Sequence, residues 1–274
     1  MASPVPVPST PEGRAGLDAL LAAPEAALIG LDFDGTLSPI VSDPGAARAH
    51  PGALPALRRL ATVVGTIAVI TGRPAGQAVE LGGLAAVPGI TVLGHYGWER
   101  WDGGTLTSPP APPGVATARR DLPAVLDSAG APDGTWTEDK DYALAVHTRR
   151  TAEPERALDL LRGPLEALAD RTGLGTEPGR LVIELRPPGT DKGAALTALT
   201  RQRGSRAVMF CGDDLGDLAA FAAVRALRGE GIPGLAVCSA SAESARVAAE
   251  ADLVVDGPDG VTALLNALAG RLSP

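Results

Sequence analysis

A short apolar run that ends in two acidic residues does most to constrain how this chain folds. Leu28–Leu31 is apolar, Asp32 and Asp34 follow with one residue between them, and a Gly-Thr pair comes next. An apolar run of this length, bounded by turn residues, is typical of a buried strand in a parallel sheet. Ligands of open α/β sheets bind at the carboxyl ends of such strands. Two carboxylates at that edge repel each other unless a cation or a proton transfer requires them, so the run also predicts a site.

The sequence on either side of this run alternates between further apolar runs and helical patterns. Together with the first run, the expected strands cover residues 27–31, 66–70, 90–93, 207–211, 235–238 and 253–255. Helices are expected at residues 17–27, 54–61, 75–81, 192–202, 217–227 and 261–272. Alternation of this kind is typical of βαβ units, so it predicts an α/β fold with a Rossmann-like parallel sheet.

The alternation is interrupted in the middle of the chain. A hairpin with a Gly-Gly turn is expected at 98–106, and a Pro-rich linker at 108–114 follows it. Next come two successive helix–strand–strand units. Their helices are expected at 115–128 and 154–171, and their strands at 135–140, 142–148, 173–176 and 181–185. We therefore expect an inserted α+β cap at 113–188, a core made of 16–112 and 189–274, and a loose Pro/Ser-rich tail at 1–15.

Composition narrows the range of partners and compartments. A formal net charge of -8 argues against binding to nucleic acid or to an anionic membrane surface. Both cysteines, Cys211 and Cys238, lie in apolar runs, so we expect core residues in a reducing cytoplasm and no disulfide. No stretch approaches the roughly 18 apolar residues of a membrane span, and no secretory signal is visible. We expect a cytoplasmic protein; its protein partners cannot be derived from the sequence.

Several polar side chains are expected at the same sheet edge although they are far apart in the sequence. They are Asp32 and Asp34 after the first strand, Thr71 after the second, Lys192 at a helix start, and Asp213 and Asp214 after a later strand. Carboxylates with a hydroxyl and an ammonium suit a divalent metal and a phosphate, and such hard oxygen ligands favour Mg²⁺. The three histidines show no ligand spacing with either cysteine, which argues against zinc.

Most of these signals also have an ordinary structural explanation. Thr71 can belong to a strand-terminating turn, Asp213 and Asp214 can cap the next helix, and Asp217 can complement the helix dipole. Lys192 is different, because a lysine near a helix start opposes the dipole and so indicates an anionic partner. The chain has only one other lysine, Lys140, so the choice of lysine at this position is informative.

Taken together, four stretches resemble the four motifs of haloacid-dehalogenase-like phosphatases. The stretches are Asp32-x-Asp34-Gly35-Thr36, Thr71-Gly72, Lys192 and Gly212-Asp213-Asp214-x-x-Asp217. Within that superfamily the chain is most similar to the trehalose-6-phosphate phosphatases. That likeness rests on Thr71-Gly72-Arg73, Gly94-His95-Tyr96-Gly97-Trp98-Glu99, Glu138-Asp139-Lys140, Leu144-Ala145-Val146-His147, Glu184-Leu185-Arg186-Pro187 and Lys192-Gly193.

The resemblance implies a mechanism. Asp32 would attack phosphorus and form an aspartyl-phosphate, and Asp34 would act as general acid and then general base. Mg²⁺ would be held by the Asp32 side chain, the Asp34 backbone carbonyl and Asp213. Thr71 and Lys192 would donate hydrogen bonds to the phosphoryl oxygens. Behind them, Asp214 and Asp217 would hold metal-bound waters or orient Lys192.

The resemblance also implies that the cap closes over the site and recognises the sugar. Its candidate substrate-binding residues are Glu138, Lys140, Glu184 and Arg186, with Arg73, His95 and Tyr96 contributed by the core. Ordinary cross-strand ion pairs are the alternative for the four cap residues. His147, on an expected strand, is interpreted as structural.

One departure from the family pattern follows Asp214. Where the family continues with Thr-Asp-Glu, this chain has Gly216, Asp217 and Leu218. The central acid is kept, and the missing Glu is expected to change the rate or the metal affinity without removing a direct ligand.

The expected function is Mg²⁺-dependent hydrolysis of trehalose 6-phosphate. Alternatives within catalysis are sucrose phosphate, mannosyl-phosphoglycerate or a hexose phosphate as substrate, or a phosphomannomutase-like reaction. A phospho-accepting signalling module is disfavoured, because Asp34 supplies an acid/base for rapid dephosphorylation and such modules lack a large inserted cap. A catalytically inactive sugar-binding protein is disfavoured because every chemical position is present.

Overall fold

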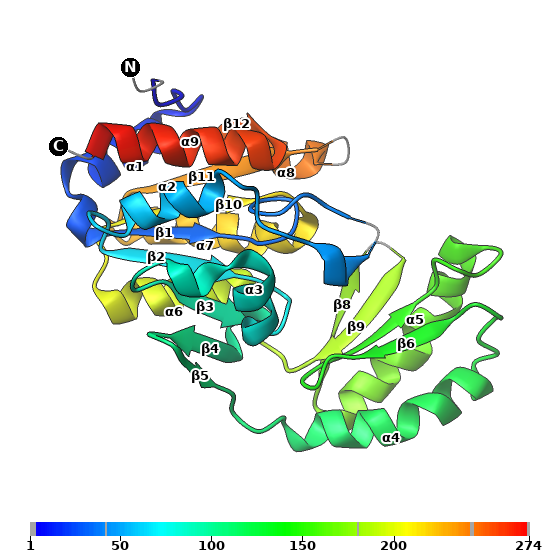
Figure 1. The fold of residues 1–274 in the computed structure, drawn as a ribbon. Coiled ribbons are helices and arrows are strands. Elements are labelled where there is room, and N and C mark those ends of the chain that lie inside the picture. Colours follow the sequence, from blue (N-terminus) through cyan, green and yellow to red (C-terminus); the bar gives the residue numbers. More distant parts are fainter. Residues whose placement is uncertain (1–3, 42, 180, 242–243, 273–274) are drawn as a thin grey trace. The chain divides into compact units, whose positions relative to one another are not determined.

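The computed structural model describes residues 4–41, 43–179, 181–241 and 244–272 (Figure 1). The chain divides into two compact units: the larger comprises the residues up to Ser108 together with those from Asp191 onward, and the smaller is Pro109–Thr190. These boundaries lie within a few residues of the ends expected for the inserted segment. None of the helices in the described part of the chain combines the length and hydropathy that crossing a lipid bilayer would require.

The larger unit is built on an eight-stranded sheet with the order β12-β11-β10-β1-β2-β3-β4-β5. The strands from β12 to β3 are parallel, and β4 and β5 form an antiparallel hairpin at one edge. The predicted parallel α/β core is therefore confirmed. The strands are β1 (Ala27–Leu31), β2 (Thr66–Ile70), β3 (Thr91–Gly94), β4 (Glu99–Asp102), β5 (Thr105–Thr107), β10 (Ala207–Gly212), β11 (Gly234–Ala240) and β12 (Leu253–Asp256).

Helices cover both faces of this sheet, which explains why its central strands β1, β2 and β10 are buried at every position. On β1, Ile29 and Leu31 belong to one hydrophobic cluster and Leu28 to another. The first cluster receives side chains from α1, α2, α3 and α9, and the second from α6, α7 and α8. The helices are α1 (Pro11–Ala22), α2 (Ala53–Leu60), α3 (Ala75–Gly82), α6 (Lys192–Arg203), α7 (Leu218–Gly229), α8 (Ala245–Ala249) and α9 (Gly257–Leu272), with 3₁₀ turns η1 (Pro24–Ala26), η2 (Pro44–Ala46), η3 (Leu84–Ala86), η4 (His95–Gly97) and η5 (Leu215–Asp217).

The expectation for the N-terminal segment is wrong in part. Residues up to 15 were expected to be loose, whereas α1 begins at Pro11. The Thr10 hydroxyl accepts a hydrogen bond from Gly13 N at 3.0 Å, and proline is favoured at the first helical position. A Cβ on Gly16 would come within 2.0 Å of the Gly234 carbonyl oxygen, so α1 lies directly against the start of β11. These capping and packing signals outweigh the Pro/Ser-rich composition.

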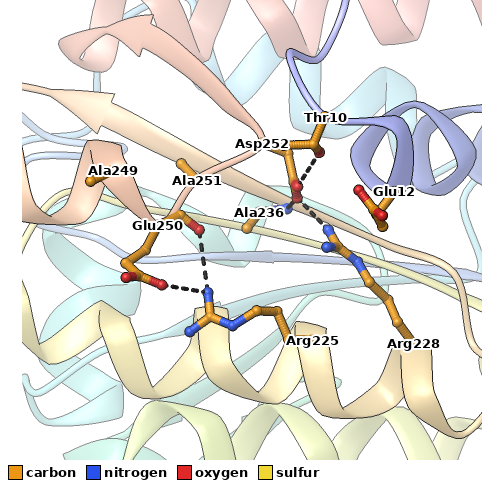
Figure 2. A pocket seen from close by; sticks show the side chains of 9 residues that line it. All are labelled: Thr10, Glu12, Arg225, Arg228, Ala236, Ala249, Glu250, Ala251 and Asp252. Atoms are coloured by element: carbon orange, nitrogen blue, oxygen red, sulfur yellow. Dashed lines mark hydrogen bonds and ion pairs between the residues drawn. The ribbon is translucent and has the colours of Figure 1, made fainter.

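Asp252, just before β12, connects four segments of this part of the molecule. Its buried carboxylate accepts hydrogen bonds from Thr10 Oγ1, from Ala236 N and from Arg228 on α7. A cavity of about 480 Å³ opens beside this carboxylate (Figure 2). Arg225 and Arg228, which line it, are ion-paired with Glu250 and Asp252 respectively. Because the arginines already have carboxylate partners, the cavity is poorly suited to binding an anion.

Asp252→Ala is expected to lower the free energy of unfolding by roughly 3 kcal/mol, because it leaves the buried Ala236 N–H without its acceptor and Arg228 without its carboxylate partner. Urea unfolding followed by circular dichroism measures the loss. The matched control is Glu250→Ala, which removes the half-exposed partner of Arg225 at 3.0 Å and is expected to cost at most about 1 kcal/mol. Equal losses in the two variants would contradict the connecting role of Asp252.

The smaller unit is an antiparallel four-stranded sheet with two helices on one face. The strand order is β6-β7-β9-β8, and Leu144, Ile183 and Leu185 pack against the helices. The alternate residues, including Glu138, Ala145 and Glu184, form what we call the polar face of the small sheet. The elements are α4 (Pro113–Ser128), β6 (Trp136–Asp139), β7 (Leu144–His147), α5 (Pro154–Thr172), β8 (Gly175–Gly179) and β9 (Val182–Arg186).

Candidate active site

A buried lysine between two buried aspartates forms the centre of the candidate site. Asp32 directly follows β1, and its N–H donates to the Cys211 carbonyl on β10 at 2.9 Å. Lys192, the first residue of α6, places its Nζ 2.9 Å from Asp32 Oδ1 and 2.7 Å from Asp217 Oδ1. All three side chains are almost completely buried. The two carboxylates therefore compensate for placing a cation at the positive end of a helix.

Asp217 holds the turn after β10 as well as the lysine. Its Oδ2 accepts hydrogen bonds from Asp213 N at 2.9 Å and from Asp214 N at 3.1 Å. A Cβ on Gly212 would come within 2.2 Å of Asp217 Cγ, so glycine is required at that position. The sequence pattern predicts a helix that begins at Asp217; in the structure Asp217 ends η5, and α7 begins one residue later. Its carboxylate is thereby directed at Lys192 Nζ and the β10 turn.

The charges of this cluster indicate what it can bind. Burial raises the pKa of Asp32 well above its usual range, and Lys192 offsets this only in part. Burial, together with the charges of Asp217 and Asp214, raises the pKa of Asp213 to about 8. Burial alone would lower the pKa of Lys192, but Asp217 and Asp32 raise it well above its usual value, so it is charged at neutral pH. Lys192 alone therefore does not supply enough positive charge to balance the buried carboxylates of this cluster.

A divalent cation would supply that charge, and the donor set fits one. Carboxylate oxygens of Asp32, Asp213 and Asp217 lie within 4.8 Å of one another. Gly35, with φ +71°, lies so close to Asp213 that a Cβ would come within 2.1 Å of its Oδ2. Thr36 Oγ1 lies 3.4 Å from Asp213 Oδ1. The side chain of Asp34 is not part of this cluster, and metal binding by its backbone carbonyl stays a prediction.

Asp34 is instead bound by Arg73. The guanidinium donates from Nε to Asp34 Oδ2 at 2.6 Å and from Nη2 to Oδ1 at 2.7 Å. It also donates from Nη1 to the Pro44 carbonyl at 2.9 Å and lies over the Phe33 ring at 5.6 Å. Arg73 was expected to bind substrate from the mouth of the core. In this conformation it holds the candidate acid/base, and a contact with sugar stays a prediction.

Thr71, His95 and Tyr96 lie together beside that pair. Thr71 Oγ1 accepts from Arg73 N at 3.2 Å, while Tyr96 N donates to the Thr71 carbonyl and His95 N to the Arg73 carbonyl, both at 2.9 Å. His95 and Tyr96 have φ values of 48° and 58°. Two successive non-glycine residues in the left-handed region are costly, and such strain is concentrated at functional sites. A Cβ on Gly72 would come within 2.8 Å of the Tyr96 hydroxyl oxygen, so the ring lies against this loop.

Glu99 was not predicted as a site residue, although it lies in one of the stretches that carry the resemblance. Its buried Oε2 accepts from Ala75 N, at the start of α3, at 2.7 Å, and its Oε1 accepts from Ser108 Oγ at 3.0 Å. His95 Nε2 lies 4.0 Å from Oε2. A carboxylate at a helix N-terminus is favourable, so Glu99 fixes α3 relative to the 95–97 turn.

The two departures from the family pattern lie at the edge of the acidic cluster. Gly216 belongs to η5, and a Cβ there would come within 3.1 Å of Asp214 Oδ1. Leu218 begins α7 and packs against the cluster that contains Phe221. An apolar side chain therefore replaces the glutamate, and the effect on rate or metal affinity stays a prediction.

The four candidate cap residues gather on the polar face of the small sheet. Across β6, β7, β9 and β8, one row of paired positions consists of Glu138, Ala145, Glu184 and Glu177. Two ion pairs and one hydrogen bond connect this face: the ion pairs join Lys140 Nζ to Glu184 Oε2 at 2.8 Å and Arg186 Nη2 to Glu177 Oε2 at 2.7 Å, and the hydrogen bond joins His147 Nε2 and Glu138 Oε2 at 3.1 Å. The sequence did not single out Glu177, because the strand expected at 173–176 ended before it, whereas β8 extends to Gly179.

Comparison with known proteins agrees with the fold and the motifs. A family model described as trehalose-phosphatase matches residues 30–256. The trehalose-phosphate phosphatase of Mycobacterium leprae is 34% identical over 254 residues, which cover 88% of this chain and 57% of that protein. This chain thus spans little more than half the length of that relative. The relative from Mycobacterium avium is 36% identical over 210 residues, covering 74% of this chain and 52% of its own length.

Among solved structures, the trehalose-6-phosphate phosphatase of Aspergillus fumigatus has a TM-score of 0.68 at 22% identity, covering 97% of this chain and 99% of that one. A haloacid dehalogenase-like hydrolase from Bacteroides thetaiotaomicron has a TM-score of 0.56 at 17% identity, covering 88% and 98%. At these identities the likeness concerns the fold, and it confirms the predicted haloacid-dehalogenase-like architecture. With the family match covering most of its length, the chain belongs to the trehalose-phosphatase family.

Proposed function

We propose that this chain is a Mg²⁺-dependent phosphatase that hydrolyses trehalose 6-phosphate to trehalose and phosphate. The observation that carries the proposal is the buried Asp32–Lys192–Asp217 arrangement with Asp213 beside it, at the carboxyl ends of β1 and β10. A buried carboxylate beside a fixed ammonium suits nucleophilic attack on a phosphoryl group. The substrate follows from the likeness to the trehalose-phosphate phosphatases of Mycobacterium leprae and Mycobacterium avium.

In the first half of the proposed reaction, an Asp32 oxygen forms a bond to phosphorus while the bond from phosphorus to the sugar oxygen breaks. The electron pair of that bond goes to the sugar oxygen, which takes a proton from Asp34. Lys192 and Thr71 donate hydrogen bonds to the phosphoryl oxygens. When bound by Asp32, Asp213 and the Asp34 carbonyl, Mg²⁺ would supply the positive charge that neutralises these oxygens.

In the second half, a water oxygen attacks phosphorus, Asp34 takes the proton from that water, and the bond to Asp32 breaks. Phosphate leaves and both aspartates return to their starting state. Arg73 donates two hydrogen bonds to Asp34, one to each carboxylate oxygen, and so fixes the direction of this side chain. Because Asp34 must present a proton to the sugar oxygen in the first half, at least one of these hydrogen bonds must be released when substrate binds.

The polar face of the small sheet favours a neutral sugar over a second anionic group. Its acids Glu138, Glu177 and Glu184 each lie beside a basic side chain. Paired carboxylates and cations can accept from and donate to hydroxyl groups, whereas they offer little surplus charge for a carboxylate. This supports trehalose 6-phosphate over mannosyl-phosphoglycerate, while sucrose phosphate, hexose phosphates and a phosphomannomutase-like reaction are distinguished by experiment.

The test is phosphate release from a panel of trehalose 6-phosphate, sucrose 6-phosphate, glucose 6-phosphate and mannosyl-phosphoglycerate. Each substrate is assayed with Mg²⁺, with chelator, and with Mg²⁺ restored after chelation. We expect the highest kcat/KM on trehalose 6-phosphate, with activity lost on chelation and recovered with Mg²⁺. Glucose 6-phosphate turned over as fast as trehalose 6-phosphate would overturn the substrate assignment, and full activity in chelator would overturn the metal.

Glu184→Ala is expected to lower kcat/KM on trehalose 6-phosphate about 10- to 100-fold, the loss typical of a charged hydrogen-bond partner. Turnover of an aryl phosphate, which offers no sugar hydroxyls, is expected to change by less than about 3-fold. Glu153→Ala is the matched control, since Glu153 also lies in the smaller unit but pairs with Arg156 at the start of α5. Equal losses on both substrates would argue that Glu184 has a structural role.

A further inference from the structure

Trp136 and His147 form a stacked pair on the polar face of the small sheet. They are directly opposed residues of β6 and β7, with ring centroids 3.9 Å apart and ring planes only 5° from parallel. Arg150 places its Cζ 5.0 Å from the Trp136 centroid. The indole therefore packs against both the imidazole and the guanidinium.

The stack directs His147 at Glu138. The imidazole Nε2 lies 3.1 Å from Glu138 Oε2, on a strand position diagonal to its own. The Glu138 side chain is 43% exposed and the His147 side chain 21%. A half-exposed glutamate normally samples several rotamers, whereas an imidazole packed flat on an indole has a fixed direction for its ring nitrogen.

We infer that His147 is a positioning residue that sets the specificity of the sugar site by holding the Glu138 carboxylate in one conformation before substrate binds. The inference rests on the proposed function, in which Glu138 binds a sugar hydroxyl. Ordering a flexible side chain on binding weakens affinity, and a side chain ordered beforehand avoids that loss. The phosphoryl chemistry does not involve His147, so its effect falls on sugar binding and leaves the chemical step unchanged.

The ordinary alternative is a surface ion pair that stiffens the sheet. Such pairs contribute little to stability when half-exposed, and their loss does not distinguish one substrate from another. The positioning role makes a different prediction, because it raises KM for the sugar phosphate alone. It also acts through Glu138, so its effect disappears once Glu138 is removed.

His147→Phe tests this, since phenylalanine keeps a flat ring against Trp136 but has no ring nitrogen. We expect KM for trehalose 6-phosphate to rise roughly 3- to 10-fold with kcat unchanged, and kcat/KM for an aryl phosphate to stay within about 2-fold. His147→Gln, which restores a side-chain amide donor, is expected to recover part of the lost affinity. Adding His147→Phe to Glu138→Ala is expected to change nothing further.

An unchanged KM in His147→Phe, equal losses on both substrates, or additive effects in the double variant would each overturn the inference. Circular dichroism of each variant checks the fold, and His147→Gln keeps the test decisive if the phenylalanine variant unfolds. Failure of the proposed function is seen separately, as a wild-type chain that does not turn over trehalose 6-phosphate. In that case the same cycle is run on whichever sugar phosphate of the panel the wild type hydrolyses.

Discussion

Asp32→Asn is expected to reduce phosphate release to below about 10⁻³ of the wild-type rate while leaving the fold intact. An amide oxygen is a far weaker nucleophile than a carboxylate and cannot form a stable acyl phosphate. The amide keeps the shape of the side chain, and its oxygen can still accept from Lys192 Nζ, 2.9 Å away in the wild type. Because burial raises the pKa of Asp32 well above its usual range, an uncharged residue is readily accommodated there.

Phosphate release is measured on trehalose 6-phosphate and on an aryl phosphate, with circular dichroism and urea unfolding as checks of the fold. Phosphate release from both substrates is expected to be lost, since the same nucleophile attacks phosphorus whichever leaving group is attached. Asp18→Asn, at an exposed position on α1, is the matched control and is expected to keep full activity. Residual turnover above that level in Asp32→Asn, with the purified variant free of wild-type protein, would remove Asp32 as the nucleophile.

Lys192→Met is expected to lower kcat/KM roughly 10²- to 10⁴-fold, because it removes a fixed positive charge from the phosphoryl oxygens. It also leaves Asp32 and Asp217 buried without the ammonium that lies 2.9 and 2.7 Å from them. Removing one member of a buried ion pair typically costs about 3–5 kcal/mol. Methionine matches the lysine stem in length, so the loss reflects charge more than packing.

The pH dependence of that loss has a definite sign. Burial raises the pKa of Asp217 to about 6 even with Lys192 present, and without the ammonium the pKa rises further. An acid whose pKa is raised by folding disfavours the folded state once it must ionise, so stability falls as the pH rises. In chelator, the wild type is therefore expected to lose the Asp217 contribution between about pH 4 and about pH 6, whereas Lys192→Met is expected to go on losing stability as the pH rises above about 6.

Lys140→Met is the matched control, since it replaces the other lysine of the chain. Lys140 pairs with Glu184 at 2.8 Å on the smaller unit and is 24% exposed. Its loss is expected to weaken turnover of trehalose 6-phosphate but not of an aryl phosphate, with a stability change of about 1 kcal/mol or less. A Lys192→Met variant that resembles this control in activity and in pH profile would contradict the role assigned to Lys192.

Features of the fold that depend on neighbouring residues were predictable from the sequence, whereas contacts between distant residues were not. The strand that ends in Asp32 and the strand that ends at Gly212 were recognisable because apolar runs with turn residues after them are local patterns. Parallel pairing of β1 with β10 then brings Asp32 and Asp213 to one edge. The start of α1 is also marked by a local signal, Thr10 before Pro11, within a segment whose Pro/Ser-rich composition favours a loose tail.

Contacts between individual side chains that are far apart in the sequence could not be predicted from local patterns. Arg73 and Asp34 are 39 positions apart, and Lys140 and Glu184 are 44 apart, and no local pattern couples them. The stack of His147 on Trp136 depends on the β6–β7 register. A shift of one residue in that register would turn one of the two rings to the other face of the sheet. The orientation of Asp217 toward Lys192 depends on η5 ending where α7 begins.

The sequence by itself therefore determined the α/β class, and it predicted an inserted small unit and a set of acids, hydroxyl and lysine at the strand ends, because hydrophobic periodicity and strand-end motifs are carried by consecutive residues. Only the tertiary structure decided which of those groups touch. It placed Lys192 between Asp32 and Asp217, Arg73 on Asp34, and His147 on Glu138, because pairings between distant residues follow from sheet register and helix packing and leave no pattern in the order of residues.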